Sequence, residues 1–143
     1  MKKKNIKEKA EKLYKKVDTF ILSSINSDGY PMTKAVVPGK FRESLNELYF
    51  STNTSSKFAN ALSKNPKASV YFYSKKLFIW KGCYIKGDME IVTDIKVKEK
   101  HWIEKFKDAY PEKSFTDPDY CLIKFTPISG RFYANFTVED FKI

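Results

Sequence analysis

Residues 50–66 have the sequence FSTNTSSKFANALSKNP, in which a β-favouring run passes through a polar stretch into a helical pattern. The first part predicts a strand that ends at Thr52, and the last part predicts a short helix over Ser55–Lys64 that ends at an Asn-Pro pair. Thr54 or Ser55 is the expected N-cap, because a side-chain oxygen accepts hydrogen bonds from the open N–H groups of a first helical turn. The block is therefore a strand, a polar turn and a helix.

The polar turn also brings together groups that suit an anion. Ser55 and Ser56 carry hydroxyl groups, and Lys57 lies in the first turn of the helix. Open N–H groups, the helix dipole and a nearby lysine together favour a phosphate dianion. An ordinary capped helix explains the same residues equally well. The GxxxxGK spacing of a P-loop is absent, so this turn is not a Walker A motif.

The segments on both sides of this block alternate between apolar and polar residues, as half-buried strands do. Two strands, Thr19–Ile25 and Tyr30–Pro38, flank Asn26–Gly29, whose Asp-Gly pair predicts a hairpin turn. Further strands are expected at 41–52, 67–74, 78–92, 120–126 and 131–136, with a turn at 127–130 between the last two. About seven antiparallel strands predict a mainly β protein, a small β-barrel.

Three peripheral helices complete the predicted architecture, one of them the helix of the block above. A second is expected at 94–108, and the residues on its apolar face are Ile95, Trp102, Ile103 and Phe106. A basic helix over residues 1–17 is expected to pack on the barrel. Four glycines are expected at turns and a fifth at a β-bulge: Gly29, Gly39, Gly87 and Gly130, and Gly82.

Composition limits the classes of protein to which the chain can belong. Its 143 residues suit a single domain over 1–143, and its 23 aromatic residues exclude a disordered polyelectrolyte in spite of a net charge of +10. Residues 1–17 hold six of these ten charges, so a helix that binds a membrane surface or nucleic acid is an alternative to a solvated flank. The chain has 25 lysines but two arginines, which argues against sequence-specific DNA recognition.

The sequence also bears on location and on metal binding. No apolar run approaches the roughly 20 residues of a membrane span, and no signal-peptide core follows the N-terminal lysines, so we expect a cytoplasmic protein without a membrane partner. Cys83 and Cys121 belong to no CxxC pair, and His101 is the single histidine. We expect all three as core residues, and no metal site.

The order of these motifs resembles the pyridoxamine 5′-phosphate oxidase-like superfamily, and within it the branch of small proteins similar to general stress protein 26. The resemblance covers about residues 10 to 137. Its most specific parts are the T-x-x-S-S-K-helix-N-P block and the strand KGCYIKGDMEIV at 81–92. It implies the FMN-binding split β-barrel fold.

The resemblance also implies cofactor-binding residues. In the family, FMN phosphate binds at the start of the helix, which here is Ser55, Ser56 and Lys57. In the family, a basic residue three places after the proline of the second strand also contacts this phosphate, and Lys34 fits that position. Most relatives have Arg there, which implies a less bidentate contact with the phosphate in this chain. The flavin ring would lie along the backbone of Lys34, Ala35 and Val36, with Thr52 at its pyrimidine end, where donors stabilise the negative charge of the reduced ring.

Family members are homodimers with FMN between the subunits, so aromatic residues of the partner are expected over the ring. The candidates are Trp102, Trp80 and the Phe132-Tyr133 pair, each of which could equally be a core residue. The resemblance implies an FMN-dependent oxidoreductase that accepts electrons from NAD(P)H and acts on a small molecule. No residue has the pattern of a dedicated catalytic acid or base.

Two alternatives to an FMN-dependent oxidoreductase stay open. The Arg-x-His-x-Arg motif of authentic pyridoxamine phosphate oxidases is missing, which argues against vitamin B6 oxidation and leaves room for a flavin- or haem-binding protein without turnover. The stretch SVYFYSKKLFIWKG at 69–82 interleaves aromatic residues with lysines, as in barrels that bind single-stranded nucleic acid. We expect Phe72, Phe78 and Trp80 to be core or interface residues instead.

Overall fold

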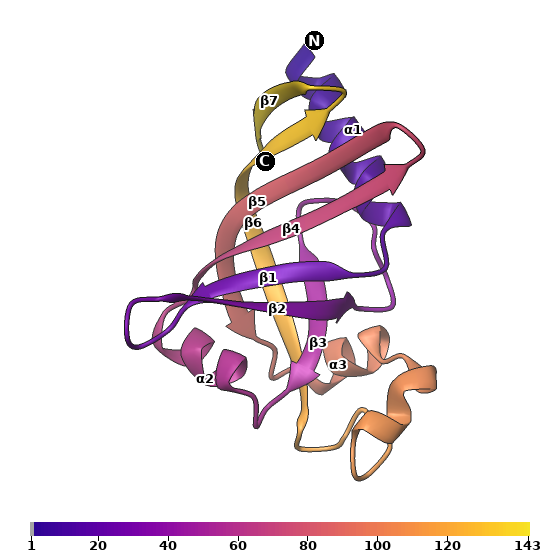
Figure 1. Ribbon diagram of the computed structural model, residues 1–143. Helices are drawn as coiled ribbons and strands as arrows, with labels where there is room; N and C mark the ends of the chain where they lie inside the picture. Colours follow the sequence, from indigo (N-terminus) through magenta and orange to yellow (C-terminus); the bar gives the residue numbers. More distant parts are fainter. Residues whose placement is uncertain (1) are drawn as a thin grey trace.

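The computed structural model describes residues 2–143, with side chains from Ile6 onward. Within these residues the chain forms seven strands, three α-helices and one 3-10 helix (Figure 1). They are α1 (Lys2–Lys16), β1 (Phe20–Ile25), β2 (Pro31–Pro38), β3 (Leu48–Asn53), α2 (Lys57–Lys64), β4 (Lys67–Lys76), β5 (Ile79–Ile91), α3 (Ile95–His101), η1 (Glu104–Ala109), β6 (Tyr120–Ala134) and β7 (Thr137–Lys142).

The strands form one antiparallel sheet that closes on itself. Their order is β3-β2-β1-β4-β5-β6-β7, and an additional pairing of β3 with β6 completes a ring. β6 is shared along its length, because residues 120–125 pair with β3 and residues 129–134 pair with β7. The mainly β split-barrel architecture expected from the sequence is confirmed.

The ring is not equally tight at every seam. β1 and β2 pair along six residues of each strand, from Phe20↔Val36 to Ile25↔Pro31. β2 and β3, in contrast, pair at Val37↔Ser51 and Pro38↔Phe50, with no further register between them within residues 2–143. The two strands therefore separate from Val36 toward the start of β2, and there one edge of β2 is left without a partner strand.

Aromatic side chains fill the interior of the barrel. Phe20 lies at its centre, with its ring centroid 5.2 Å from that of Phe72, 5.4 Å from that of Phe50 and 5.5 Å from that of Tyr14. Tyr14 comes from α1, whose apolar stripe also buries Ala10 and Leu13. The Arg42 guanidinium donates hydrogen bonds to the carbonyl oxygens of Tyr14 and Val17, which holds the end of this helix on the barrel.

The predicted turns at Gly87 and Gly130 and the predicted bulge at Gly82 are wrong, for one physical reason. β6 is a single strand through Pro127 and Gly130, where a turn was predicted, and β7, which was not predicted, pairs with its second half. A Cβ on Gly130 would lie 2.5 Å from the Phe141 ring, and one on Gly87 would lie 2.2 Å from the Thr126 carbonyl oxygen. The irregularity of register falls at Lys86/Gly87, whereas pairing is regular at Gly82. These glycines permit close approach between neighbours inside the sheet.

Two predicted elements are shorter than expected. The strand expected at 41–52 is limited to Leu48–Asn53, and the residues before it form a loop. The helix expected at 94–108 breaks at Trp102, which has extended backbone angles (φ −64°, ψ 133°), and the chain continues as η1. This break matters for the site, because it turns Trp102 toward the open seam.

Candidate functional site

A pocket of about 400 Å³ lies where β2 and β3 separate. Its walls come from three parts of the chain that are far apart in sequence: β2 with the residue before β1, the end of β3, and the α3–η1 segment with Tyr120. The lining residues are Thr19, Lys34, Ala35, Val36, Val37, Ser51, Thr52, Asn53, Trp102, Ile103, Phe106, Ala109, Tyr110 and Tyr120. We call it the β2–β3 pocket.

Lys34 supplies the positive charge of this pocket. Its ammonium group donates a hydrogen bond of 2.8 Å to the hydroxyl of Thr52, which is itself buried. In the part of the chain that the structure describes, no carboxylate lies within ion-pair distance of Lys34. A cation without a carboxylate partner next to a buried hydroxyl is suited to an electron-rich ligand atom.

The open edge of β2 adds backbone groups. Gly39 N–H donates to the Tyr49 carbonyl at 2.7 Å, so the backbone N–H and C=O of residue 39 face β3. The direction of the backbone N–H and C=O groups alternates from residue to residue along a strand. Those of Val37 and Ala35 therefore also face the β3 side, whereas those of Lys34 and Val36 face β1. Val37 is paired with β3 and Ala35 is not. Of the three backbone candidates, Ala35 thus presents its N–H and C=O to the pocket.

Aromatic rings form another part of the pocket lining. The Trp102 ring lies 5.6 Å from that of Tyr110 and 5.0 Å from that of Tyr120, and its Nε1–H donates to a Glu104 carboxylate oxygen at 2.8 Å. The Tyr110 hydroxyl donates to the Thr52 carbonyl at 3.2 Å. Burial raises the pKa of Tyr110 and of Tyr120 to about 12, so both are neutral phenols near pH 7. They can shape the pocket and donate hydrogen bonds, but they are poor bases.

The predicted phosphate turn lies just beyond the pocket. Ser56 is the N-cap of α2, and its hydroxyl accepts a hydrogen bond of 3.1 Å from Ala59 N–H. Ser55 N–H donates to the carboxylate of Asp119 at 3.0 Å, and Asn53 Nδ2 donates to the same carboxylate at 2.8 Å. These two hydrogen bonds lower the pKa of Asp119. The backbone N–H groups of residues 57 and 58 have no acceptor inside the helix, so they stay open to a ligand.

The structure brings together part of the predicted site. Lys34, Ala35, Val36, Thr52 and Trp102 line one pocket, whereas Ser55, Ser56 and Lys57 begin two residues after its last β3 residue, Asn53. Trp102 reaches the pocket from the same chain, although it was expected from a partner. Ile103, Phe106 and Tyr110 were not predicted as site residues.

Trp80, Phe132 and Tyr133, the other candidates for covering the ring, lie elsewhere. Trp80 and Tyr133 line a separate shallow hollow on the outside of the sheet, and Phe132 is buried in the core. Phe78, expected in the core or at an interface, is fully exposed in this single chain, whereas Phe72 is a core residue as expected.

The histidine and the cysteines are core residues, as expected. His101 is buried and stacks on Tyr49 with 4.2 Å between ring centroids, and burial, with the charge of Lys100, lowers its pKa to about 4. Cys83 and Cys121 are buried free thiols, and burial raises the pKa of Cys83 to about 12. Within residues 2–143 no cluster of three metal-ligating side chains occurs. No helix in this range is both long and apolar enough to span a bilayer.

A second, larger hollow of about 860 Å³ lies at the other end of the barrel, beside β7. Lys7, Lys86 and Lys142 line it, together with Arg131, whose guanidinium is paired with Asp140 at 2.7 Å. Its aromatic lining residues are Tyr84 and Phe141, and it lacks the cluster of Trp102, Tyr110 and Tyr120 rings that lines the β2–β3 pocket. Size alone therefore does not identify the site.

Comparisons with known proteins identify the family and the fold. A family model described as "Pyridoxamine 5′-phosphate oxidase" matches residues 6–134. A solved protein from Clostridium acetobutylicum, related to general stress protein 26 of B. subtilis and placed in the pyridoxinephosphate oxidase family, is 29% identical with a TM-score of 0.84, covering 97% of this chain and 95% of that chain. A comparison with curated proteins finds no match.

Two further solved structures share the fold at lower identity. A pyridoxamine 5′-phosphate oxidase-related, FMN-binding protein from Nostoc punctiforme is 17% identical with a TM-score of 0.65, covering 88% of this chain and 86% of that chain. A heme-binding protein from Mycobacterium smegmatis is 12% identical with a TM-score of 0.79, covering 96% of this chain and 57% of that chain.

Proposed function

This chain belongs to the pyridoxamine 5′-phosphate oxidase family, and from this premise we propose that it binds FMN in the β2–β3 pocket. The observation that carries the proposal is the unpaired edge of β2 at Ala35, which lines the same pocket as Lys34 and Trp102. Backbone donors, a cation and an aromatic wall are the groups that a flavin ring needs.

Each part of the cofactor would have its own set of residues. The ring would lie between Ala35 and Trp102, with Lys34 and Thr52 as donors at its electron-rich pyrimidine end. The phosphate would lie against Lys57 and the open N–H groups at the start of α2. When bound, FMN supplies the hydride and electron chemistry that no side chain of the pocket provides. The protein's own part is to bind, to orient and to exclude water.

We propose further that the protein is an oxidoreductase that takes electrons from NADH or NADPH and passes them to a small acceptor. Ile103 and Phe106 give the outer wall an apolar character, which favours a flat, weakly polar acceptor. Tyr110 and Tyr120, as neutral phenols, would not remove protons from a substrate near pH 7. This agrees with a site in which the cofactor performs the chemistry.

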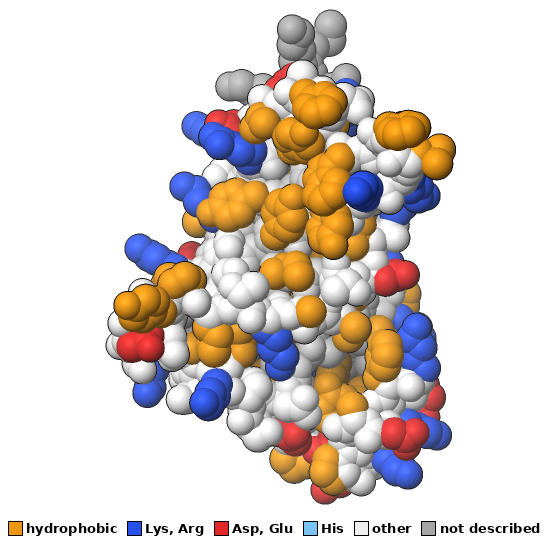
Figure 2. Space-filling view, viewed as in Figure 1, with side chains coloured by type: hydrophobic (Ala, Val, Ile, Leu, Met, Phe, Trp, Pro, Cys, Tyr) orange, Lys and Arg blue, Asp and Glu red, His pale blue; other side chains and the backbone are white. Residues whose placement is uncertain are grey.

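A homodimer in the cytoplasm is the proposed working form. Aromatic side chains lie exposed on the outside of β4 and β5, and Figure 2 shows them as an apolar area over the upper half of the view. Contiguous exposed apolar surface of this kind is typical of an interface.

Flavin or haem binding without turnover is the alternative within the same fold. Histidine ligation of haem is disfavoured at the β2–β3 pocket, because the chain has one histidine, His101, and it is buried beside Tyr49 outside this pocket. Single-stranded nucleic acid remains the alternative outside flavin chemistry, on the exposed tyrosines of β4.

The absorption spectrum of the purified protein tests the proposal. We expect a flavin spectrum, or its appearance when FMN is added to colourless protein. FMN should be retained by the Tyr30→Ser variant, a change at an exposed side chain outside the pocket, and largely lost by Lys34→Ala. Anaerobic addition of NADH or NADPH should bleach the flavin. A folded protein that takes up no FMN would exclude the proposal, and bound flavin that neither nucleotide bleaches would exclude the oxidoreductase part.

A further inference from the structure

The turn between β3 and α2 is fastened to the segment just before β6. The pairing of β3 with β6 ends at Asn53↔Tyr120. Beyond it, Thr54 N–H donates to the Asp119 carbonyl at 2.9 Å, and the Thr54 hydroxyl donates to the Pro118 carbonyl at 3.0 Å. In Figure 1 the end of β3 and the start of β6 lie together in the lower half of the view, and the chain passes from there into α2. The turn is therefore an extension of the β3–β6 seam.

The carboxylate of Asp119 holds the same turn through two more hydrogen bonds. One oxygen accepts the Ser55 N–H at 3.0 Å, and the other accepts Asn53 Nδ2 at 2.8 Å. Hydrogen bonds to an ionised acceptor are stronger than those between neutral groups. Because both favour the charged form, they lower the pKa of Asp119, and the group is ionised near pH 7. The carboxylate therefore restrains the turn at neutral pH.

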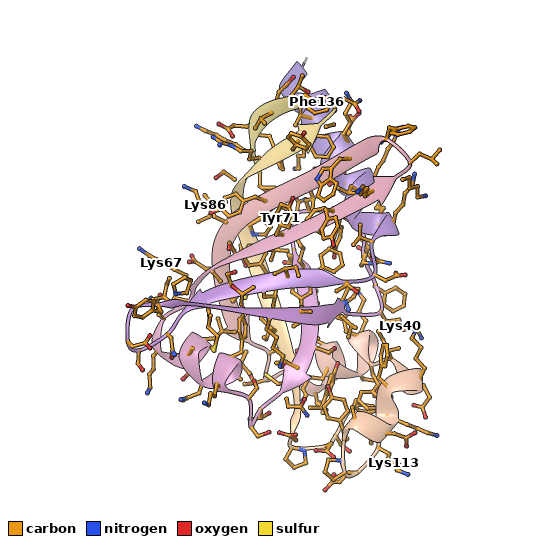
Figure 3. The ribbon with its side chains drawn as sticks, viewed as in Figure 1. Lys40, Lys67, Tyr71, Lys86, Lys113 and Phe136 are labelled. Atoms are coloured by element: carbon orange, nitrogen blue, oxygen red, sulfur yellow. The ribbon has the colours of Figure 1, made fainter. Side chains whose placement is uncertain are left out.

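Asp119 is itself held by a buried neighbour. The carboxylate of Asp117, which is 2% exposed, accepts the Asp119 N–H at 2.7 Å and also the Glu112 N–H. Tyr120 N–H donates to the Asp117 carbonyl at 3.0 Å, where β6 begins. In Figure 3, Lys113, from the loop that leads to these residues, lies at the lower end of the view. Contacts within the chain thus set the position of the Asp119 carboxylate.

These contacts decide which donors of the turn stay available. The Ser55 N–H already has an acceptor, and Ser56 N–H donates to the Asn53 carbonyl at 3.0 Å. The next two N–H groups, of residues 57 and 58, have no acceptor inside the helix. Lys57 adds a positive charge beside them. Since the turn fixes the direction in which α2 begins, binding of a phosphate at this place depends on the orientation of the turn.

We propose that Asp119 is a positioning residue for the cofactor phosphate: by holding Ser55 and Asn53, it aims the start of α2 at the place where the phosphate binds. This role rests on the proposed function and adds a residue that does not touch the cofactor. The carboxylate acts through the turn, because a direct contact between two anions is repulsive.

The effect of Asp119 should be selective for the phosphate. The proposed ring site is formed by β2 and Trp102, which have no hydrogen bond to the Asp119 carboxylate. Riboflavin has the same ring as FMN but no phosphate. A loosened turn should therefore weaken the binding of FMN and leave that of riboflavin almost unchanged, whereas a general loss of structure would weaken both.

Titration of the full chain with FMN and with riboflavin, followed by flavin fluorescence, tests this role. Asp119→Ala should weaken FMN binding by about 10-fold and riboflavin binding by less than about 2-fold. Asp140→Ala is the matched control, because it removes a carboxylate that also accepts two hydrogen bonds, from Arg131 beside β7. This control should change neither affinity.

An exchange of two side chains provides a rescue, and it decides the question if Asp119→Ala does not fold. In Asn53→Asp/Asp119→Asn the hydrogen bond between positions 53 and 119 is kept with its direction reversed, and an oxygen at position 119 still accepts the Ser55 N–H. The ratio of FMN to riboflavin affinity should stay within about 3-fold of that of the unchanged protein. Asn53→Asp alone places two carboxylates together and should lower this ratio about 10-fold.

The outcomes separate this role from the proposed function. Equal losses of FMN and riboflavin affinity in Asp119→Ala, or no loss of either, would overturn the positioning role and leave FMN binding in place. A gain in FMN affinity would also overturn it, because the carboxylate would then compete with the phosphate for the donors of the turn. If the unchanged protein binds neither flavin, the proposed function fails, and the positioning role fails with it.

Discussion

Two seams of the same barrel differ in how completely their strands pair. β5 and β6 pair from Lys81↔Ala134 to Ile91↔Ile123, with one irregularity of register. Glycines allow these two strands to approach their neighbours closely. β2 and β3 meet at two positions and then separate. The β5–β6 seam uses its backbone N–H and C=O groups for pairing, whereas the β2–β3 seam leaves some of these groups without a strand partner. The candidate site lies at the incomplete seam.

The largest loss of stability is expected for a substitution in the closed part of the barrel. Phe20→Ala removes a fully buried ring that contacts three other aromatic rings, and it should lower the free energy of unfolding by about 4 kcal/mol. Urea denaturation measures the change, with Tyr30→Ala as an exposed control that should alter stability little. Equal losses in the two variants would contradict the assigned core.

The next largest effect is a pH dependence of stability, and it arises beside the short stretch where β2 and β3 pair. His101 packs against Tyr49 of β3, and a Cβ on Gly39 would lie 2.5 Å from its Nδ1. Its pKa is lowered from 6.5 to about 4, so as the pH falls the unfolded chain binds this proton before the folded chain does. Stability should be complete above pH 6.5 and fall toward pH 4, by on the order of 3 kcal/mol from this group.

The contribution of His101 can be isolated by comparison with His101→Gln. This variant does not titrate in the same range, so the difference between the two pH profiles reports the histidine alone. Parallel profiles would show that His101 is not buried as a neutral side chain.

At the open seam, binding and stability should separate. Lys34→Met removes the charge and leaves an unbranched side chain one atom shorter, and it should weaken FMN binding by about 30-fold, as expected for one charged hydrogen bond. The urea midpoint should change little. Lys34→Arg is the control that retains the charge. Fluorescence titration of FMN measures the affinity, and unchanged affinity in Lys34→Met would remove this residue from the site.

The smallest effect is expected at the pocket wall. Trp102→Phe keeps an aromatic ring but loses the hydrogen bond from Nε1 to Glu104, which lies at the surface. We expect about a 3-fold loss of FMN affinity, while the quenching of Trp102 fluorescence by bound flavin disappears. The Trp80→Phe variant, outside the pocket, should retain that quenching.

The tight seams were the easier part to predict from the sequence. Asp28-Gly29 and the alternation around it located the β1–β2 hairpin, and the Asn65-Pro66 pair located the end of α2. β6 was divided wrongly because Pro127 and Gly130 are turn formers by composition, yet here they lie at and after a register shift, where a missing N–H and a missing Cβ are tolerated. β7 carries one buried residue, Phe141, so its alternation is weak.

The open seam required tertiary information. Lys34 and Thr52 were found because of a family resemblance, since a lysine and a threonine 18 residues apart give no signal by themselves. Ile103 and Phe106 matched the apolar face of a helix, and the break at Trp102 that turns them toward the pocket depends on contacts with Tyr110 and Tyr120. Local pattern does not reveal such a break.

The pairing of β3 with β6 also constrains when the pocket can exist. Residues 48–53 pair with residues 120–125, so a chain emerging from the ribosome cannot close its barrel until β6 has been synthesised. The β1–β2 hairpin, in contrast, can form from neighbouring residues much earlier. If FMN binds in the β2–β3 pocket as proposed, its capture would be a late event of biosynthesis, and nascent chains stalled before β6 should not bind FMN.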